Sequence, residues 1–279
     1  MRKTLIISVL ALLCVCQNSW GWCFAHKVVA HIAMQHLTPA TQQKLDYYFD
    51  SSIVEYSLWM DRFRHEPSAA ALNKNHMGVC NEDFSCDSTL ASEMGNLEAW
   101  VAKEFEMLKN YKQLPDSTVR TELKFLVHQL GDMHCPGHFY SFDMPEWKTY
   151  GKILKGMKSK YGWFKLTYKG KKTTYHAIWD LALDYTHPEF GEKVGLFTKA
   201  IDKDVTPEKA AEMVAGSIFD WGRDRNVRCK PIYEWAKPGS ELDETFFQEH
   251  GWLVDEMVLK AGYRLAHLLN QIFDENYGK

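Results

Sequence analysis

The chain has 279 residues, seven cysteines, twelve histidines and a formal net charge of −3 at pH 7. A chain of this length can form one large domain with a substantial core. Its slightly acidic balance excludes a protein that binds long duplexes through a broad basic surface, and favours a small, locally charged site.

The first 21 residues predict a secretory signal peptide. Two basic residues precede an apolar run from Leu5 to Val15, and Ser19 and Gly21 place small residues at −3 and −1 of a cleavage site. The apolar run is too short for a permanent membrane-spanning helix, so we expect no stable membrane anchor, although a retained anchor is the alternative. Cleavage leaves a mature domain over residues 22–279 with 31 basic and 36 acidic residues, a net charge of −5. We expect an exported protein, periplasmic or secreted.

Apolar periodicity and capping residues predict a mainly α fold. Thr38-Pro39 and Thr206-Pro207 each pair an N-cap residue with proline in the first helical turn. Apolar residues three or four apart predict helices over residues 88–111, 117–133 and 255–273. The segment 163–175 differs, because its strand-forming residues surround a Lys-Gly-Lys turn and predict a β-hairpin. We expect a single helical domain with a small β-hairpin.

Five cysteines remain after signal removal: Cys23, Cys80, Cys86, Cys135 and Cys229. An odd number in an exported protein leaves at least one thiol free or paired between chains. Cys80 and Cys86 flank a polar loop and could form a disulfide bond with each other, or one of them could pair with Cys229. No C-x-x-C pair is present, which disfavours a zinc site made of thiolates.

Two His-x-x-x-Asp pairs, His128–Asp132 and His176–Asp180, carry the ligand types of a metal site. Residues four apart share one helix face, and imidazole and carboxylate are both zinc ligands. His138 follows the first pair beyond a break at Pro136, where the chain can turn back to the same cavity. A single such pair is more often a surface or capping ion pair. Two pairs, with His138 and a histidine near the processed N-terminus, favour a metal site.

The segment from Phe125 to His138, F-L-V-H-Q-L-G-D-M-H-C-P-G-H, is similar to a block of one enzyme family. That block, F-L-V-H-x-x-G-D-x-H-Q-P-L-H, belongs to the zinc-dependent single-strand nuclease and 3′-nucleotidase family, of the nuclease S-one/P-one type. Trp59-Met60-Asp61 resembles the family's W-A-D motif, His76 falls where the family places a histidine, and residues 176–180 resemble its H-x-V-W-D motif. The resemblance covers essentially the whole mature chain and implies a helical fold shared with bacterial zinc phospholipases C.

The resemblance implies three zinc ions held by nine residues. The first ion would be bound by Asp61, His76, His128 and Asp132, and the second by His138, His176 and Asp180. The third would be bound by the α-amino group and carbonyl of Trp22 and the side chain of His26, with Asp132 as a bridge. Signal removal would complete this site, because an amide nitrogen inside a longer chain cannot supply the lone pair of an amine.

The resemblance also implies catalysis by a metal-activated water, without a nucleophilic serine or cysteine. We expect Asp61, Asp132 and Arg64 to act at the reacting phosphate, with Asp132 serving as an ionised ligand rather than as a base. Arg64 lies where the family has a basic residue facing phosphate, and a solvated arginine is the alternative. Arg64, Met77 and Lys165 are the expected substrate contacts.

Several positions depart from the family pattern. Trp22 and His26 are four residues apart rather than five, and Met77 stands where the fungal enzymes have a base-stacking aromatic residue. The family's G-G-N segment is replaced by a longer run over residues 148–172 with nine lysines, no acidic residue and several aromatic residues. We interpret this run first as a solvated lysine-rich arm whose aromatic residues pack beneath it, and a channel for single-stranded nucleic acid is the alternative.

The leading hypothesis is a zinc endonuclease and 3′-nucleotidase that acts on single-stranded nucleic acid or nucleotides and leaves 5′-phosphate products. The runner-up is a zinc phospholipase C with the same ligands and a lipid phosphodiester as substrate. A third hypothesis is a helical binding protein with structural zinc, but His138, His176 and Asp180 provide only three ligands and leave a position open. No obligate protein partner is inferred.

Overall fold

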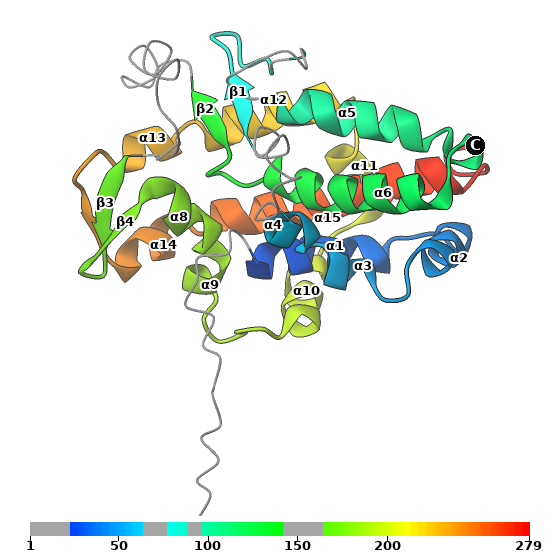
Figure 1. Cartoon of the computed structure of the whole chain (residues 1–279). Coiled ribbons are helices and arrows are strands. Elements are labelled where there is room, and N and C mark those ends of the chain that lie inside the picture. Colours follow the sequence, from blue (N-terminus) through cyan, green and yellow to red (C-terminus); the bar gives the residue numbers. More distant parts are fainter. Residues whose placement is uncertain (1–22, 64–76, 87, 89–95, 142–163) are drawn as a thin grey trace, which may run out of the picture.

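The computed structural model describes residues 23–63, 77–86, 88, 96–141 and 164–279. Within these ranges helices dominate and the strands are few and short, as the sequence predicts (Figure 1). Two long helices, α6 (Asp116–Asp132) and α15 (Trp252–Phe273), pack against each other and confirm two of the predicted helices. None of the helices in the described ranges is long and apolar enough to cross a bilayer.

Helix α1 (Cys23–Gln35) packs closely against α15. Most of α1 is buried, including Phe24, Val28, Val29 and Ile32. A side chain at Gly262 of α15 would overlap Ile32, so the glycine permits this close approach. The first turn of α1, which carries His26, is therefore held inside the core.

The remaining helices surround these three (Figure 1). They are α2 (Pro39–Tyr48), α3 (Ile53–Tyr56), α4 (Trp59–Phe63), α5 (Leu97–Leu108), α8 (Tyr175–Asp180), α9 (Ala182–Thr186), α10 (Val194–Asp202), α11 (Pro207–Met213), α12 (Ile218–Cys229), α13 (Ile232–Trp235) and α14 (Glu244–His250), with a 3₁₀ turn at Tyr111–Gln113. The hydroxyls of Thr38 and Thr206 cap α2 and α11 as predicted, each accepting from a backbone N–H at 3.3 Å.

The helix predicted over residues 88–111 is observed in part. Helix α5 covers residues 97–108, and most of the earlier predicted portion lies outside the described residues. The helix ends before Tyr111 and a 3₁₀ turn follows. Leu114, directly before Pro115, is extended, since a proline disfavours helical geometry at the residue before it, and so the 3₁₀ turn does not continue into α6.

The predicted hairpin forms from β3 (Lys165–Tyr168) and β4 (Lys171–Thr174), which pair antiparallel. Lys169 and Gly170 in the turn both have positive φ, 49° and 73°, as a tight two-residue hairpin requires. A third strand, β5 (Glu241–Leu242), lies parallel to β3, and β1 (Gly78–Cys80) lies parallel to β2 (Phe139–Ser141). Neither parallel pair was predicted, because each joins segments that are far apart in the sequence.

The disulfide bond considered from the sequence is not formed. Cys86 and Cys229 are free thiols, which rules out a bridge between Cys80 and Cys86 and any bridge of either to Cys229. Cys86 lies instead against α12, with its Sγ 3.9 Å from the carbonyl of Phe219 and 3.6 Å from the amide of Asn226. Burial raises the pKa of the Cys229 thiol to about 12, so it stays protonated at neutral pH.

Candidate metal centre

His26, Asp61, His128 and Asp132 form a buried inner cluster. On α6, His128 and Asp132 share one face, as their spacing predicts, with Nε2 and Oδ2 3.3 Å apart. The Nε2 of His26, on α1, lies 3.1 Å from Asp132 Oδ1, and the imidazoles of His26 and His128 stack with centroids 4.0 Å apart. Asp61 comes from α4, with Oδ1 3.9 Å from the Nε2 of His128. Three helices therefore direct ligand-type atoms to one point.

His138, His176 and Asp180 form an outer cluster. Asp180 lies one turn after His176 on α8, and its two carboxylate oxygens lie 3.1 Å from the Nε2 atoms of His138 and His176. The two imidazoles stack with centroids 4.7 Å apart. Helix α8 begins directly after the hairpin, where the hydroxyl of Thr174 caps it by accepting from Ala177 N–H at 3.2 Å. The hairpin thus fixes the start of the helix that carries two of the three residues.

The two clusters meet at Asp132. The Nδ1 of His138 lies 3.2 Å from Asp132 Oδ1, so the carboxylate faces imidazoles of both clusters. Asp132 is buried, with a side chain 1% exposed. Its Oδ1 faces His26 and its Oδ2 faces His128, so the carboxylate has the arrangement that a bridging metal ligand needs.

Backbone carbonyls fix the tautomers of two histidines. The Nδ1 of His128 lies 2.7 Å from the carbonyl of Ser57, and the Nδ1 of His176 lies 2.9 Å from the carbonyl of Gly137. Because a carbonyl can only accept, each Nδ1 donates, and in a neutral ring Nε2 then carries the lone pair. Each Nε2 faces the carboxylates. An imidazole with one nitrogen bonded to a carbonyl and the other turned to a carboxylate cluster is typical of metal-binding histidines.

The separations between the donor atoms fit zinc. Zinc in proteins is tetrahedral with bonds of about 2.0–2.1 Å to nitrogen and oxygen, so its ligand atoms lie about 3.4 Å apart. The nitrogen–oxygen separations in both clusters are 3.1 to 3.9 Å. The donor types and spacing are therefore suited to a small divalent cation of this kind.

The electrostatics of the clusters keep the carboxylates ionised. Burial opposes ionisation of Asp132, but His128 and His138 outweigh it and hold its pKa well below the usual range. Burial likewise opposes ionisation of Asp180, while His176 and His138 lower its pKa. Burial also works against a proton on His128, yet Asp132 and Asp61 raise the pKa of that imidazole to about 9. A cation entering the inner cluster must therefore displace a proton from His128.

His134 and Cys135 pack beside the clusters. The Nδ1 of His134 donates to the carbonyl of Leu130 at 2.8 Å, and Nε2 accepts from Arg264 at 2.8 Å, so both nitrogens are engaged. Burial and Arg264 hold the pKa of His134 well below its usual value. The Cys135 thiol lies 3.8 Å from Asp180 Oδ1, and burial raises its pKa well above the usual value. Cys135 is thus a neutral thiol next to the outer cluster.

Of the five other site residues predicted from the sequence, the structure describes only Met77 and Lys165. Trp22, Arg64 and His76 lie outside the described residues. Met77 is half-buried directly before β1, and its carbonyl accepts from Leu97 N–H at 3.2 Å. Lys165 is exposed on β3, paired in register with Thr174. Thr174 is two residues before His176, so Lys165 lies next to the strand that leads into the outer cluster.

The sequence analysis missed a buried ion pair between Glu98 of α5 and Arg225 of α12. Both side chains are fully buried, and the Arg225 guanidinium lies 4.8 Å from the ring centroid of Phe139. Its Nη1 also donates to the carbonyl of His138 at 3.4 Å, and Gly78 N–H donates to the same carbonyl at 2.9 Å. The pair therefore supports the backbone of an outer-cluster histidine. No sequence motif marks these two residues, which are 127 positions apart.

A helical domain with two histidine–carboxylate clusters joined at a shared aspartate indicates a metal-binding helical protein. Comparison with known proteins is more specific. The model of the S1/P1 nuclease family matches residues 20–274, and the chain belongs to that family.

Named relatives cover nearly the whole chain. It is 22% identical over 303 residues to Nuclease S1 of Aspergillus oryzae, covering 98% of each protein. It is 23% identical over 301 residues to Endonuclease 2 of Arabidopsis thaliana, again covering 98% of each, and 21% identical over 305 residues to Endonuclease 1 of the same plant. As a member of a nuclease family, the chain is a phosphodiester hydrolase.

Proposed function

We propose that the chain is a zinc-dependent endonuclease that hydrolyses single-stranded DNA or RNA and also acts as a 3′-nucleotidase, with 5′-phosphate products. The observation that carries the proposal is the position of Asp132 between two clusters of histidine and carboxylate. Family membership supports a nucleic-acid substrate, and the named relatives are nucleases rather than phospholipases.

Three zinc ions would be held by nine residues. The inner cluster, with His76, would bind one ion through Asp61, His128 and Asp132, and the outer cluster would bind a second through His138, His176 and Asp180. The third would be bound by His26, Asp132 and the amino terminus of Trp22. The position of His26 in the first turn of α1, with its Nε2 3.1 Å from Asp132 Oδ1, supports this last assignment, because it brings the start of α1 to the inner cluster.

Bound zinc would supply Lewis acidity toward a phosphoryl oxygen and a water of lowered pKa. The protein's own groups prepare the site for that chemistry. Asp132 remains ionised between imidazoles of both clusters, and Asp180 orients His138 and His176 through its two oxygens. The carbonyls of Ser57 and Gly137 hold two rings in the tautomer that presents Nε2. Asp61 and Asp132 would act as ligands of the bound ions, and the burial of their carboxylates excludes bulk water.

The substrate would enter at the outer cluster. The His176 side chain is 28% exposed, whereas those of His128 and His26 are 0% and 1% exposed. A structural zinc site is closed on all sides, while a catalytic site keeps a position open. The exposure of His176 favours a catalytic site over a structural one. Arg64, Met77 and Lys165 are the proposed substrate contacts.

Export is part of the proposal. Residues 1–21 would act as a signal peptide, and their removal would free the Trp22 amine for zinc while releasing the protein to the periplasm or the medium.

The substrate can be tested by parallel assays on single-stranded DNA, duplex DNA of the same sequence and phosphatidylcholine. We expect rapid hydrolysis of the single strand to 5′-phosphate products, slow hydrolysis of the duplex and none of the lipid. Turnover of phosphatidylcholine without hydrolysis of single-stranded DNA would overturn the proposal in favour of a phospholipase C.

A further inference from the structure

Helices α3, α4 and α6 carry a row of half-buried aromatic side chains with one lysine among them. We name this group the aromatic track, and it consists of Tyr56, Trp59, Phe63, Lys124 and Phe125. Each side chain is half-buried, so part of it remains accessible to solvent. None of the five belongs to the two metal clusters.

Each member of the aromatic track contacts at least one other member. Trp59 and Phe63 stack with centroids 4.6 Å apart and planes 13° apart. Trp59 meets Phe125 edge to face at 5.2 Å. The Nζ of Lys124 lies 4.8 Å from the ring centroid of Tyr56 and 5.3 Å from that of Trp59. The result is a continuous strip of rings with a positive charge near its middle.

The track starts at the wall of the inner cluster. Trp59 and Phe63 are four residues apart on α4 and share one face, while Asp61 between them is buried and points to His128. Lys124 lies one turn before His128 on α6, on the same side of the helix, a rise of about 6 Å along the axis. The strip therefore leads away from the metal ligands toward α3, at a spacing comparable to one nucleotide.

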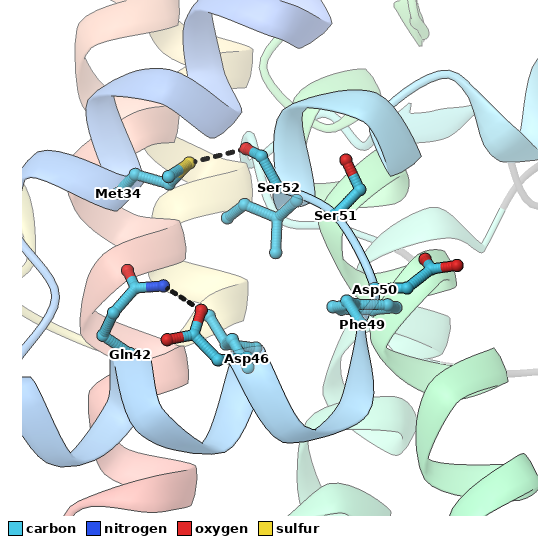
Figure 2. A pocket seen from close by; sticks show the side chains of 9 residues that line it. Met34, Gln42, Asp46, Phe49, Asp50, Ser51 and Ser52 are labelled. Carbon is cyan, nitrogen blue, oxygen red and sulfur yellow. Dashed lines mark hydrogen bonds between the residues drawn. The ribbon is translucent and has the colours of Figure 1, made fainter.

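Beyond Tyr56 the surface becomes acidic. Phe49 stacks on Tyr56 with centroids 4.5 Å apart and lines a cavity of about 480 Å³ between α1, α2 and α3 (Figure 2). Its rim includes Asp46, which accepts from Gln42 at 2.7 Å, and Asp50, which accepts from the Tyr56 hydroxyl. Figure 2 shows the Gln42 and Asp46 side chains turned toward each other on α2. Carboxylates repel phosphates, so a nucleic-acid strand following the track would leave the surface at Tyr56.

We propose that the aromatic track binds single-stranded nucleic acid beyond the scissile phosphate, with bases against the solvent-accessible parts of the Trp59, Phe63 and Tyr56 rings and a backbone phosphate at Lys124. Aromatic rings stack on any base, whereas a duplex keeps its base faces covered. The track therefore gives this face a preference for single strands without sequence selection. It deepens the proposed nuclease function and rests on it.

The test compares substrates of two lengths. The zinc-loaded protein and the variants Trp59→Leu and Lys124→Gln are assayed with octathymidylate and with the dinucleotide TpT. We expect the ratio of kcat/KM for the octamer to that for TpT to fall about tenfold in each variant. Lys44→Gln is the matched control, because Lys44 also lies over an aromatic ring, at 5.8 Å from Tyr111, but on α2. Its ratio should equal that of the parent protein.

Salt dependence separates a phosphate contact from a structural role. Loss of one phosphate contact to a single strand should reduce the slope of log KM for the octamer against log salt by about 0.7 in Lys124→Gln. The slope should not change in Trp59→Leu. If Trp59→Leu does not fold, the test of the aromatic track uses Trp59→Phe, which keeps a ring, together with the salt slope of Lys124→Gln.

Three results would overturn the proposal. The first is an unchanged octamer-to-dinucleotide ratio in both variants. The second is an unchanged salt slope in Lys124→Gln. The third is binding of the parent protein to phosphatidylcholine vesicles that Trp59→Leu abolishes while the ratio is retained, which would assign the track to a lipid surface. A parent protein that hydrolyses neither oligonucleotide refutes the nuclease function, and the Kd for fluorescein-labelled octathymidylate, measured by anisotropy, then decides the track by itself.

Discussion

A methyl group added at Gly131 should displace His26 from the inner cluster. Gly131 lies on α6 directly before Asp132, and a Cβ built there would lie 2.8 Å from Cε1 of His26 and closer still to Nδ1. Ordinary contact begins at 3.4 Å, so the imidazole must move by at least about 0.6 Å, beyond the roughly 0.5 Å that a working site tolerates. His26 is confined by its stack on His128, and the buried ring has little room to move.

The expected effect of Gly131→Ala is larger on activity than on stability. Replacing a helical glycine by alanine stabilises by about 0.5–1 kcal/mol, while overpacking a core costs about 1–3 kcal/mol. Overpacking prevails, and we expect a net loss of about 1 kcal/mol. Misplacing a ligand by about 1 Å can lower the rate about 100-fold. We expect the variant to lose about one zinc per chain and to hydrolyse single-stranded DNA roughly 10- to 100-fold more slowly.

The assay combines metal analysis of the purified variant, thermal unfolding and initial rates on single-stranded DNA. Gly195→Ala is the matched control, because Gly195 is also helical and also faces a histidine, but its added Cβ would lie 3.5 Å from the ring of His31. That is an ordinary contact, so this variant should keep its zinc and its rate. A Gly131→Ala protein with full zinc content and the parent rate would refute the steric reasoning.

Three further predictions concern the core, the surface charges and the N-terminus. Arg225→Met should lower the free energy of unfolding by about 3–5 kcal/mol, because it leaves Glu98 as a buried unpaired charge. Thermal unfolding measures the effect, and the double variant Arg225→Met/Glu98→Gln should recover part of the lost stability. His187 lies 2.8 Å from Asp255, and although burial opposes its protonation, Asp255 and Glu189 raise its pKa. Its stabilising charge is fully present below the unfolded pKa of about 6.5 and is lost as pH rises through the higher folded pKa. Denaturation of His187→Gln should therefore show a loss of about 1 kcal/mol at pH 5.5 that shrinks by pH 9, and an equal loss at both values would contradict the ion pair. A protein that retains extra residues before Trp22 should bind one zinc fewer and lose most of its activity. Full activity of this extended protein would show that the Trp22 amine is not a zinc ligand.

The local features of the fold could be predicted from the sequence. Thr38-Pro39 and Thr206-Pro207 mark helix starts, and the Lys-Gly-Lys turn marks the hairpin, since each depends on neighbouring residues alone. Helix α1 was not predicted. The sequence also gives no indication that α1 packs against Gly262 of α15. The parallel pairing of β1 with β2 and of β3 with β5 depends on tertiary packing, which no local pattern records.

The candidate site was predicted to a similar extent. The four-residue spacing places His128 with Asp132 and His176 with Asp180, because helix geometry fixes the distance between such residues. That His26 meets Asp132 followed only from the family resemblance. The resemblance placed His138 with His176 and Asp180, and its contact with Asp132 was not predicted. The Glu98–Arg225 pair and the bonds from the histidines to the Ser57 and Gly137 carbonyls belong to the folded state and leave no sequence signal.

The most direct test of the central claim is a zinc titration of the chelator-stripped mature protein, with the initial rate of single-stranded DNA hydrolysis as the readout. The stripped protein should be inactive, and the rate should rise with added zinc and level off at about three equivalents per chain, one for each ligand set. Hydrolysis that survives complete removal of the metal, or a zinc-loaded protein that leaves single-stranded DNA intact, would contradict the account.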